Sequence, residues 1–397
     1  MNASTLRAFY RSIVPFEARL ILREVRQGGV RALWPSLEAY QTMMNAAVHR
    51  AAAGDVIFPP SLPWRTMLFQ RPHQMARAFA QLGWRVWFMS YDSMDTEGAG
   101  LREVEPNLYV VSLPFRAYRR LFAGLAHPLV VAYTYHHPFL ALFPNARLVY
   151  ELVDHLEVFT DEQPMALLGR WHADLLRRAA VVTATADDLR DGLQAARPDA
   201  LLCPNGVDYA HFADVPAGEP PDDLAPLLAD GRPIIGYYGN LDPRVIDFDL
   251  ICQSARALPD CQFVVIGPDA SGGLNAMPSN VYGLGAKPYA ELPRYLSHFS
   301  TAAIPFQVNA VTSAVSPVKL FEYMAGGRPI VTTDLRECRK YPVVMVSDDR
   351  ESYIANLRRA LSLSHDAGFQ ERLRAAAREN TWQARVRQIV QAVERAR

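Results

Sequence analysis

Short apolar runs alternate with helix-like segments through the first half of the chain. Strands are predicted at 56–58, 86–89, 109–111, 130–133, 148–152 and 181–184, and helical patterns near 74–82 and 162–178 lie between some of them. Buried strands that are separated by helices form a parallel sheet covered on both faces. Residues 54–208 are therefore predicted to form a Rossmann-like α/β domain.

A second series of the same kind follows a polar, proline-rich segment at 209–222, which we interpret as a linker. Its strands are predicted at 234–238, 262–266, 281–283, 302–305, 330–332 and 343–346. A second Rossmann-like domain is thus expected over 223–378. Ligands of such sheets bind beyond the carboxyl ends of the strands, so two facing domains leave a cleft for two substrates.

Residues 1–53 precede the first strand and show helical apolar spacing. The first 50 residues contain seven arginines but only three glutamates, so an interfacial helix touching anionic lipid is one interpretation. The other is an extra helical layer packed on the first domain. Pro15 and the Gly28-Gly29 pair break the pattern into pieces too short for strong membrane affinity, which favours the packed layer.

The composition argues against several classes of partner and against secretion. The 41 basic and 41 acidic residues balance, whereas a nucleic-acid-binding protein normally carries a basic excess. The four cysteines have no Cys-x-x-Cys spacing, and the longest apolar stretch, 129–143, is too short and too interrupted to span a bilayer. No secretion signal is recognisable. A cytoplasmic protein is predicted, with contact to the inner membrane face as the alternative role of its first residues.

The stretch 316–333 combines several signals of one binding site. Ser316 suits a helix N-cap, Pro317 suits the first helical position, the Gly326-Gly327 pair ends the helix, and a strand follows. The free N–H groups at such a helix start attract phosphate. A nucleotide-sugar diphosphate would therefore meet the backbone and side chains of the first turn and the next, which are Ser316, Pro317, Val318, Lys319, Leu320 and Glu322.

Two side chains in this stretch carry charges that suit the same ligand. The Lys319 ammonium is placed to neutralise the diphosphate, unless it is an ordinary exposed helix lysine. The Glu322 carboxylate can accept hydrogen bonds from sugar hydroxyls, unless it is a solvated helix glutamate. Gly239, in a turn after a predicted strand, would let backbone approach the diphosphate, and Arg244 beyond it is a second candidate cation.

Residues 316–333 resemble the donor-binding segment of GT-B glycosyltransferases, with the large family-four-like group as the best match. Three further segments agree in order and spacing: Pro-Asn-Gly-Val-Asp at 204–208, Ile-Gly-Tyr-Tyr-Gly at 235–239 and Phe-Val-Val-Ile-Gly-Pro at 263–268. Together they cover most of 200–335. Trp64 and the Phe-Gln-Arg-Pro-His-Gln run at 69–74 resemble transferases of bacterial cell-surface polysaccharide pathways.

The resemblance implies a fold and a chemistry. It implies two Rossmann-like domains facing a cleft, a helix at 379–397 that crosses back to the first domain, and a Glu322 carboxylate that binds the ribose hydroxyls of the donor. It also implies an acceptor on the first domain, retention of anomeric configuration, and a leaving group stabilised by a helix N-terminus and cations without a required metal or other cofactor. The sequence itself contains no recognised metal-binding motif.

Two positions depart from the family pattern. Retaining members carry a glutamate eight residues before the one matched by Glu322, and here that position is Ala314, although Asn309, Thr312 and Ser313 nearby could bind the donor sugar instead. An arginine often follows the glycine matched by Gly239, with a lysine six residues later. This chain has Asn240 and Val245-Ile246 there, and whether Arg244 takes the place of either basic residue is open at this point.

The first domain offers candidates for the acceptor side. The usual Gly-Gly loop after the first strand is replaced by 59–65, which contains Trp64. Arg71 and His73 follow at a predicted helix start, where they either reach a phosphate or acceptor hydroxyl or simply cap and pack the turn. His136 and Asp154 each follow a predicted strand, so either could be the acceptor-activating base, a sugar contact or a structural loop residue.

These observations predict a glycosyltransferase that moves a sugar from a nucleoside diphosphate to a carbohydrate or lipid-linked acceptor in bacterial surface polysaccharide synthesis. Two alternatives remain open at this point. A sugar-nucleotide 2-epimerase would use the same fold, and a catalytically silent scaffold would be consistent with Ala314. Retention of Lys319 and Glu322 argues against the scaffold, because a scaffold has no chemical need for a phosphate site.

Overall fold

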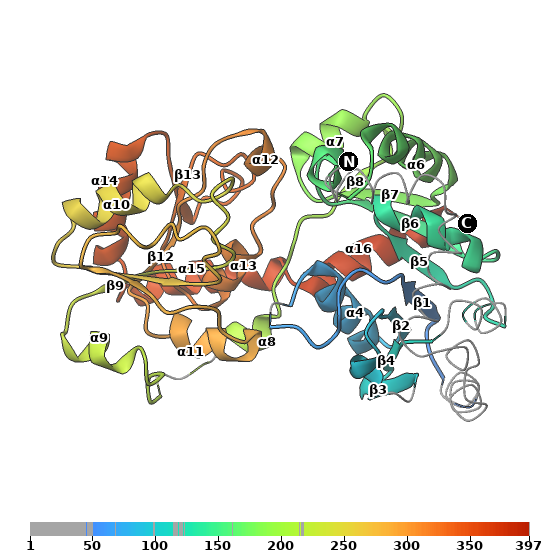
Figure 1. Cartoon of the computed structure of the whole chain (residues 1–397), viewed down its shortest axis with the longest axis horizontal. Coiled ribbons are helices and arrows are strands. Elements are labelled where there is room, and N and C mark those ends of the chain that lie inside the picture. The colour runs from blue at the N-terminus through green and yellow to red at the C-terminus, as the bar shows by residue number, and fades with distance from the viewer. Residues whose placement is uncertain are drawn as a thin grey trace, which may run out of the picture.

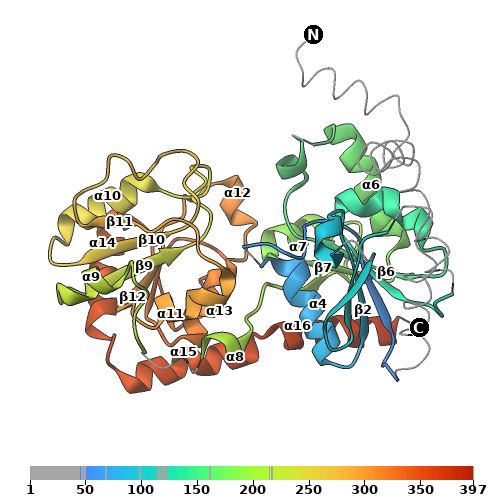
Figure 2. The ribbon, with the colours of Figure 1, turned by 60° about the horizontal axis from the view of Figure 1, so that its bottom comes forward.

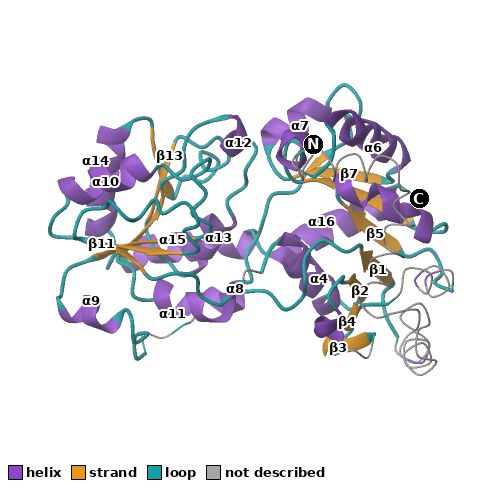
Figure 3. Cartoon of the chain, viewed as in Figure 1, coloured by secondary structure: helices purple, strands orange, loops and turns teal. Residues whose placement is uncertain are grey.

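The computed structural model of the chain describes Asn45 and residues 51–67, 69–97, 100–113, 118, 122, 124–160, 162–213, 215 and 218–396. It contains two α/β domains side by side (Figure 1). Each has a central sheet flanked by helices, as Figure 3 shows in orange and purple. The two predicted Rossmann-like domains are therefore present. The helical extension predicted for 1–53 lies outside the described residues, apart from Asn45 and 51–53.

The first domain is built on an eight-stranded sheet with the order β3-β4-β2-β1-β5-β6-β7-β8. Its strands are β1 (Asp55–Phe58), β2 (Arg85–Met89), β3 (Leu101–Glu105), β4 (Leu108–Val111), β5 (Leu129–Ala132), β6 (Arg147–Leu152), β7 (Val181–Ala184) and β8 (Leu201–Leu202). All pairs are parallel except β3 with β4. The two edge strands β3 and β8 were not predicted, because one is rich in charge and the other spans two residues.

Alternate residues of each central strand enter two separate cores. Val56 and Phe58 belong to one buried cluster and Ile57 to the other. A strand that is apolar on both faces forms a continuous hydrophobic run in the sequence, and this is why these strands could be predicted. The sheet is flanked by α4 (Arg71–Gln81), α6 (Met165–Arg178) and α7 (Asp187–Leu193) and by the short 3-10 helices η2 (Ser93–Thr96), η3 (Thr134–Leu142) and η4 (Leu156–Phe159).

The second domain has a fully parallel six-stranded sheet with the order β11-β10-β9-β12-β13-β14. Its strands are β9 (Ile234–Tyr238), β10 (Gln262–Ile266), β11 (Val281–Gly283), β12 (Thr301–Ile304), β13 (Ile330–Thr333) and β14 (Val344–Ser347). The helices are α8 (Tyr209–Phe212), α9 (Ala225–Ala229), α10 (Phe248–Ala257), η5 (Tyr289–Glu291), α11 (Leu292–Leu296), α12 (Ala310–Ser313), α13 (Val318–Ala325), α14 (Arg350–Ser362) and α15 (Ala367–Glu379).

A last helix, α16 (Trp382–Arg395), leaves the second domain and packs on the first. Figures 1 and 2 both show it running from below α13 to the side of α4. Trp382, Val386, Ile389 and Val393 are buried in the cluster that contains Val56. Their spacing places them on one face of the helix, so this single stripe supplies part of the first domain's core. In the described part of the chain, no helix is both long and apolar enough to cross a membrane.

Replacing Trp382 should therefore lower the thermal stability of the first domain, although this residue lies far from that domain in sequence. Trp382→Ala removes a large buried side chain, which typically costs about 3–5 kcal/mol. We expect the thermal unfolding midpoint to fall by several degrees. Arg387→Ala, on the exposed face of the same helix, is the control and should leave the midpoint nearly unchanged. Equal midpoints for the two variants would contradict this assignment.

Candidate functional site

Two glycines bring separate turns of the second domain into contact at the carboxyl ends of their strands. Gly239 follows β9 with a φ of 151°, and Gly267 follows β10 with a φ of 155°. The Gly239 N–H donates to the Ile266 carbonyl at 2.9 Å. A Cβ atom added at position 267 would lie 1.8 Å from the Gly239 carbonyl oxygen, so only glycine allows this approach.

The start of α13 lies beside the Gly239 turn. An added Cβ at Gly239 would lie 2.9 Å from Cε of Lys319, which shows how closely the lysine stem passes under the turn. The Lys319 Nζ atom lies 4.8 Å from the ring centroid of Phe306 and 5.5 Å from that of Tyr237. Among the described residues, no carboxylate forms an ion pair with it. A cation stacked on aromatic faces without an anion is well placed to receive one.

The predicted cap of this helix is wrong by one residue. Pro317 is the N-cap and Val318 the first helical residue, and no side chain caps the helix. Ser316 is buried and its Oγ accepts a hydrogen bond from the backbone N–H of Asn205 at 3.1 Å. The hydroxyl is therefore used to bind another segment of the chain. The Leu320 N–H donates to the Pro317 carbonyl at 3.1 Å, and since the helix lacks a side-chain cap, the amides of Val318 and Lys319 are the candidates for binding a ligand.

Glu322 lies one turn into α13 and is only 5% exposed, which rules out a solvated surface glutamate. Burial raises the pKa of its carboxyl, and the Tyr238 phenol faces it. Burial likewise lowers the pKa of the Lys319 ammonium. Each charge is disfavoured by the surroundings and favoured by the other, so the two titrate together. A ligand whose hydroxyls donate hydrogen bonds to Glu322 and whose negative charge lies near Lys319 would stabilise the charged forms of both residues.

Arg244 stands on the rim of this region. Its guanidinium is 72% exposed and pairs with the Asp242 carboxylate at 2.6 Å. Its backbone carbonyl accepts from Asn309 Nδ2 at 2.9 Å. The predicted second cation is thus present near the Gly239 turn, but in this conformation it is held by a neighbouring carboxylate.

The candidate acceptor residues near the start of the first domain are buried and contact other residues of that domain. Trp64 is 9% exposed and packs against the rings of Phe69, His73 and Phe88. The Gln70 N–H donates to His73 Nδ1 at 3.2 Å, and Nε2 donates to the Pro63 carbonyl at 2.9 Å. Burial lowers the pKa of His73, so the ring is neutral with both nitrogens occupied. This geometry is that of a helix cap and a core residue.

Arg71 is also engaged within the protein. Its Nη2 lies 2.6 Å from the Glu151 carboxylate, and its Nη1 donates to the Pro204 carbonyl and to Asn205 Oδ1, both at 3.1 Å. Both members of the ion pair are buried, and the Glu151 charge together with hydrogen bonding raises the pKa of the guanidinium against the effect of burial. The guanidinium fork therefore joins α4 to β6 and to the segment that leaves the first domain, and is not free for an acceptor.

His136 and Asp154 differ in what burial does to them. His136 Nδ1 accepts from the Tyr133 N–H at 3.1 Å, and burial lowers its pKa to about 3, so it remains neutral. Asp154 lies beyond the carboxyl end of β6 and is partly buried, which raises its pKa to about 6. A carboxyl group with that pKa can accept a proton near neutral pH, so Asp154 retains the properties expected of a base.

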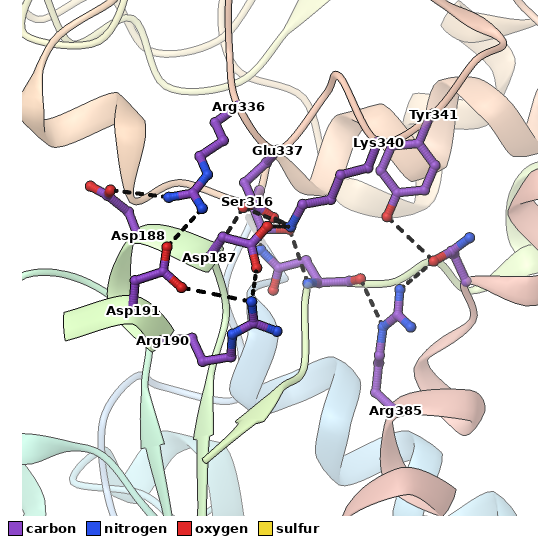
Figure 4. A network of polar contacts seen from close by, with 12 residues as sticks. Asp187, Asp188, Arg190, Asp191, Ser316, Arg336, Glu337, Lys340, Tyr341 and Arg385 are labelled. Carbon is purple, nitrogen blue, oxygen red and sulfur yellow. Dashed lines mark hydrogen bonds and ion pairs between the residues drawn. The ribbon is translucent and has the colours of Figure 1, made fainter. Parts of the chain in front are cut away.

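A polar network between the domains was missed by the sequence analysis. Lys340 Nζ lies 2.7 Å from the carboxylates of Asp187 and Glu337, and Glu337 also accepts from the Asp187 N–H at 2.8 Å. Arg336 contacts Asp191 and Asp188, while Ser313 donates to Asp188 at 2.8 Å. Figure 4 shows the α7 carboxylates facing Arg336 and Lys340 from the second domain. The partners lie about 150 residues apart, and no local pattern signals such pairing.

The network surrounds the position at which the family glutamate is missing. Ala314 is 1% exposed and belongs to the hydrophobic cluster of the first domain. A glutamate in this arrangement would be buried among apolar side chains, at a high desolvation cost. Separately, the described residues contain no group of three or more histidine, cysteine, aspartate or glutamate side chains that could hold a metal ion.

Comparison with known proteins connects this geometry to a family. Residues 232–362, about a third of the chain, match the family model described as glycosyl transferases group 1. The matched segment contains β9 to β14 and α13, so the second domain is similar to that of group 1 glycosyltransferases. TuaH of Bacillus subtilis, named as a teichuronic acid biosynthesis glycosyltransferase, is 30% identical over 231 residues, which are 54% of this chain. The match spans 57% of the length of TuaH.

Solved structures share the fold of this chain at low sequence identity. Sucrose-phosphate synthase from Thermosynechococcus elongatus superposes with a TM-score of 0.63 at 15% identity, covering 86% of this chain and 98% of that one. HepE of Anabaena, in complex with UDP, gives a TM-score of 0.62 at 13% identity, covering 86% and 100%. The predicted GT-B fold is thereby confirmed.

The contact between the two glycine turns predicts a large difference between two alanine variants. Gly267→Ala and Gly285→Ala both place alanine at a positive φ, which costs roughly 1–2 kcal/mol. Only Gly267→Ala also forces a backbone carbonyl to move, at roughly 1–3 kcal/mol more. We expect the thermal midpoint of Gly267→Ala to lie clearly below that of Gly285→Ala. Similar midpoints would show that the turns are not packed as described.

Proposed function

We propose that this glycosyltransferase moves a sugar from a nucleoside diphosphate to a carbohydrate or lipid-linked acceptor. The observation that carries the proposal is the start of α13, where backbone amides, the Lys319 ammonium and the buried Glu322 carboxyl lie within two turns. These groups complement a diphosphate on one side and ribose hydroxyls on the other. The UDP bound to HepE makes uridine diphosphate the first nucleotide to test. The name of TuaH supports a role in bacterial surface polysaccharide synthesis.

The reaction breaks the bond between the anomeric carbon and the β-phosphate oxygen, and the electron pair stays with the nucleoside diphosphate. An acceptor hydroxyl oxygen bonds to the anomeric carbon, and its proton passes to a base or to the departing phosphate. Negative charge thus grows where Lys319 and the α13 amides lie, which stabilises the transition state. We expect these groups to serve without a metal ion, and we propose retention of configuration, as the family resemblance implies.

A hollow in the first domain is the proposed place of the acceptor. It has a volume of about 210 Å³ and opens beyond the carboxyl end of β6. Leucine side chains line part of it, and His155, Glu157, His172 and Asp188 supply polar groups. Apolar surface for a sugar ring and polar groups for its hydroxyls are what a carbohydrate needs. Asp188 also binds Ser313 of the second domain at 2.8 Å, so the hollow adjoins the seam between the domains.

The adjoining residues suggest how the acceptor would be activated. Asp154 is next to His155 in the chain, and its pKa of about 6 allows it to take a proton at neutral pH. We propose Asp154, in place of His73 and His136, as the candidate base. We also propose a cytoplasmic location, where contact of the first 53 residues with the inner membrane face remains an alternative.

The donor proposal predicts ligand-dependent stabilisation. UDP at 100 times its Kd should raise the stability of the protein by about 2.7 kcal/mol, seen as a higher thermal midpoint. Glu322→Gln and Lys319→Met should lose most of this shift, because each removes one charge of the pair. Lys287→Met is the matched control, since Lys287 pairs with Asp223 in another part of the second domain.

The panel should include other nucleoside diphosphates and their sugars. A shift with one of them, lost in both α13 variants and kept in Lys287→Met, supports the donor site. Release of free diphosphate only with acceptor distinguishes transfer from 2-epimerisation. The absence of a shift with every member would overturn the proposal and favour a scaffold.

The acceptor proposal predicts that a substitution in the hollow changes the KM for the acceptor but not the KM for the donor. His172→Gln removes an imidazole from the hollow but keeps an acceptor for the Tyr150 hydroxyl, which lies 2.7 Å from His172 Nδ1. The KM for the acceptor should rise about tenfold, the effect of losing roughly 1.4 kcal/mol, with the KM for the donor unchanged. His137→Gln is the control, because His137 pairs with Asp174 and does not line the hollow. If both variants behave alike, the acceptor binds elsewhere.

A further inference from the structure

Asn205 stands where the chain leaves the first domain, and each of its polar groups is bonded. Its N–H donates to Ser316 Oγ at 3.1 Å and its Nδ2 to the Ser316 carbonyl at 2.6 Å. Its Oδ1 accepts from Arg71 Nη1 and its carbonyl from Arg385 Nε, both at 3.1 Å. One residue thus joins α4, α16 and the residue that precedes the N-cap of α13. Ser316 and Arg385 both belong to the network drawn in Figure 4.

Arg71 fixes the orientation of the Asn205 side-chain amide, while Arg385 binds the backbone carbonyl of the same residue. Arg71 can only donate, so the group facing it must be the amide oxygen, and the NH₂ group then faces Ser316. Arg71 is itself held by the buried ion pair with Glu151, which ties this choice to the core of the first domain. Arg385 also donates to Asn380. The amide therefore cannot rotate without breaking bonds on both sides.

This orientation matters at the start of α13. The Ser316 carbonyl belongs to the peptide group that leads into the N-cap Pro317, so the Nδ2 bond at 2.6 Å fixes that peptide plane. The carbonyl oxygen is drawn toward Asn205. A carbonyl turned toward the helix start would repel a phosphate, whereas the amides of the first turn attract one.

We propose that Asn205 is a positioning residue for the donor. It holds the Ser316-Pro317 peptide so that the first turn of α13 presents amides to the diphosphate. Its hydrogen bonds with Arg71 of α4 and Arg385 of α16 connect the position of this peptide to the packing of the first domain. This inference rests on the proposed function, because it assumes that a nucleoside diphosphate binds at α13. It adds a residue of the segment that connects the domains to the determinants of donor affinity.

The test is a substitution that changes one atom. Asn205→Asp keeps an oxygen for Arg71 but places a second oxygen against the Ser316 carbonyl in place of a donor. We expect the Kd for UDP, measured by calorimetry, and the KM for the UDP sugar to rise about tenfold or more, with the KM for the acceptor unchanged.

Asn380→Asp is the matched control. Asn380 lies at the same junction, where its Oδ1 accepts from Arg385 and its Nδ2 donates to the Ala376 carbonyl at 2.8 Å, and it has no hydrogen bond with Ser316. Asn380→Asp should therefore lower the thermal midpoint without ligand at least as much as Asn205→Asp while leaving the donor constants within about twofold of wild type.

The outcomes separate this inference from the proposed function. If the wild-type protein binds no nucleoside diphosphate, the proposed function fails and this inference fails with it. If the wild type binds UDP and Asn205→Asp binds it equally well, only the positioning role is overturned. Should Asn205→Asp not fold, Asn205→Ser replaces it. That variant also lacks the Nδ2 donor, and an unchanged Kd for UDP would again overturn the role.

Discussion

The first turns of α13 hold an ammonium and a carboxyl in surroundings that disfavour both charges. Burial shifts the pKa of Lys319 downward and that of Glu322 upward, and the two groups offset only part of this cost for each other. Such shifts are typical of binding and catalytic sites, where a ligand supplies further partners, and they are the basis of the donor-site proposal. Much of the surrounding structure keeps this helix start in place. The Gly239 turn, which packs on the Gly267 turn, lies against the Lys319 stem, and Asn205 fixes the peptide that leads into the helix.

The architecture and the α13 site were predictable from the sequence because their signals are local. Strands buried on both faces are continuous apolar runs, and a helix start with lysine and glutamate three residues apart is visible in one short stretch. Trp64, Arg71, His73 and His136 have side chains that suit either a substrate contact or a structural role, and residue type alone does not show which of the two the fold uses. Arg71 pairs with Glu151, 80 residues later, and with Pro204, 133 residues later. Asp154 has the same kind of strand-end position as His136, but burial raises the pKa of its carboxyl to about 6 and lowers the pKa of the His136 imidazole to about 3.

The seam between the domains explains the clearest departure from the family. Ala314 occupies the place of a glutamate, and it is buried in the first domain's hydrophobic cluster. The neighbouring Ser313 binds Asp188, and Arg336 and Lys340 extend the same contact to the other carboxylates of α7. In the conformation described here, the segment that would face a donor sugar therefore rests against the first domain. Opening of this seam would expose Ala314 and release several ion pairs together, so the two domains are expected to move as a coupled pair.

The path of α16 has a consequence for how the protein is made. Trp382, Val386, Ile389 and Val393 complete a hydrophobic cluster whose other members include Val56 and Phe58, so the first domain's core contains side chains from both ends of the described chain. During synthesis on a ribosome, that cluster stays incomplete until residues 382–393 have left the exit tunnel. The nascent first domain would display an apolar groove beside α4 throughout translation of the second domain, and chaperones that bind apolar segments would have their longest opportunity there.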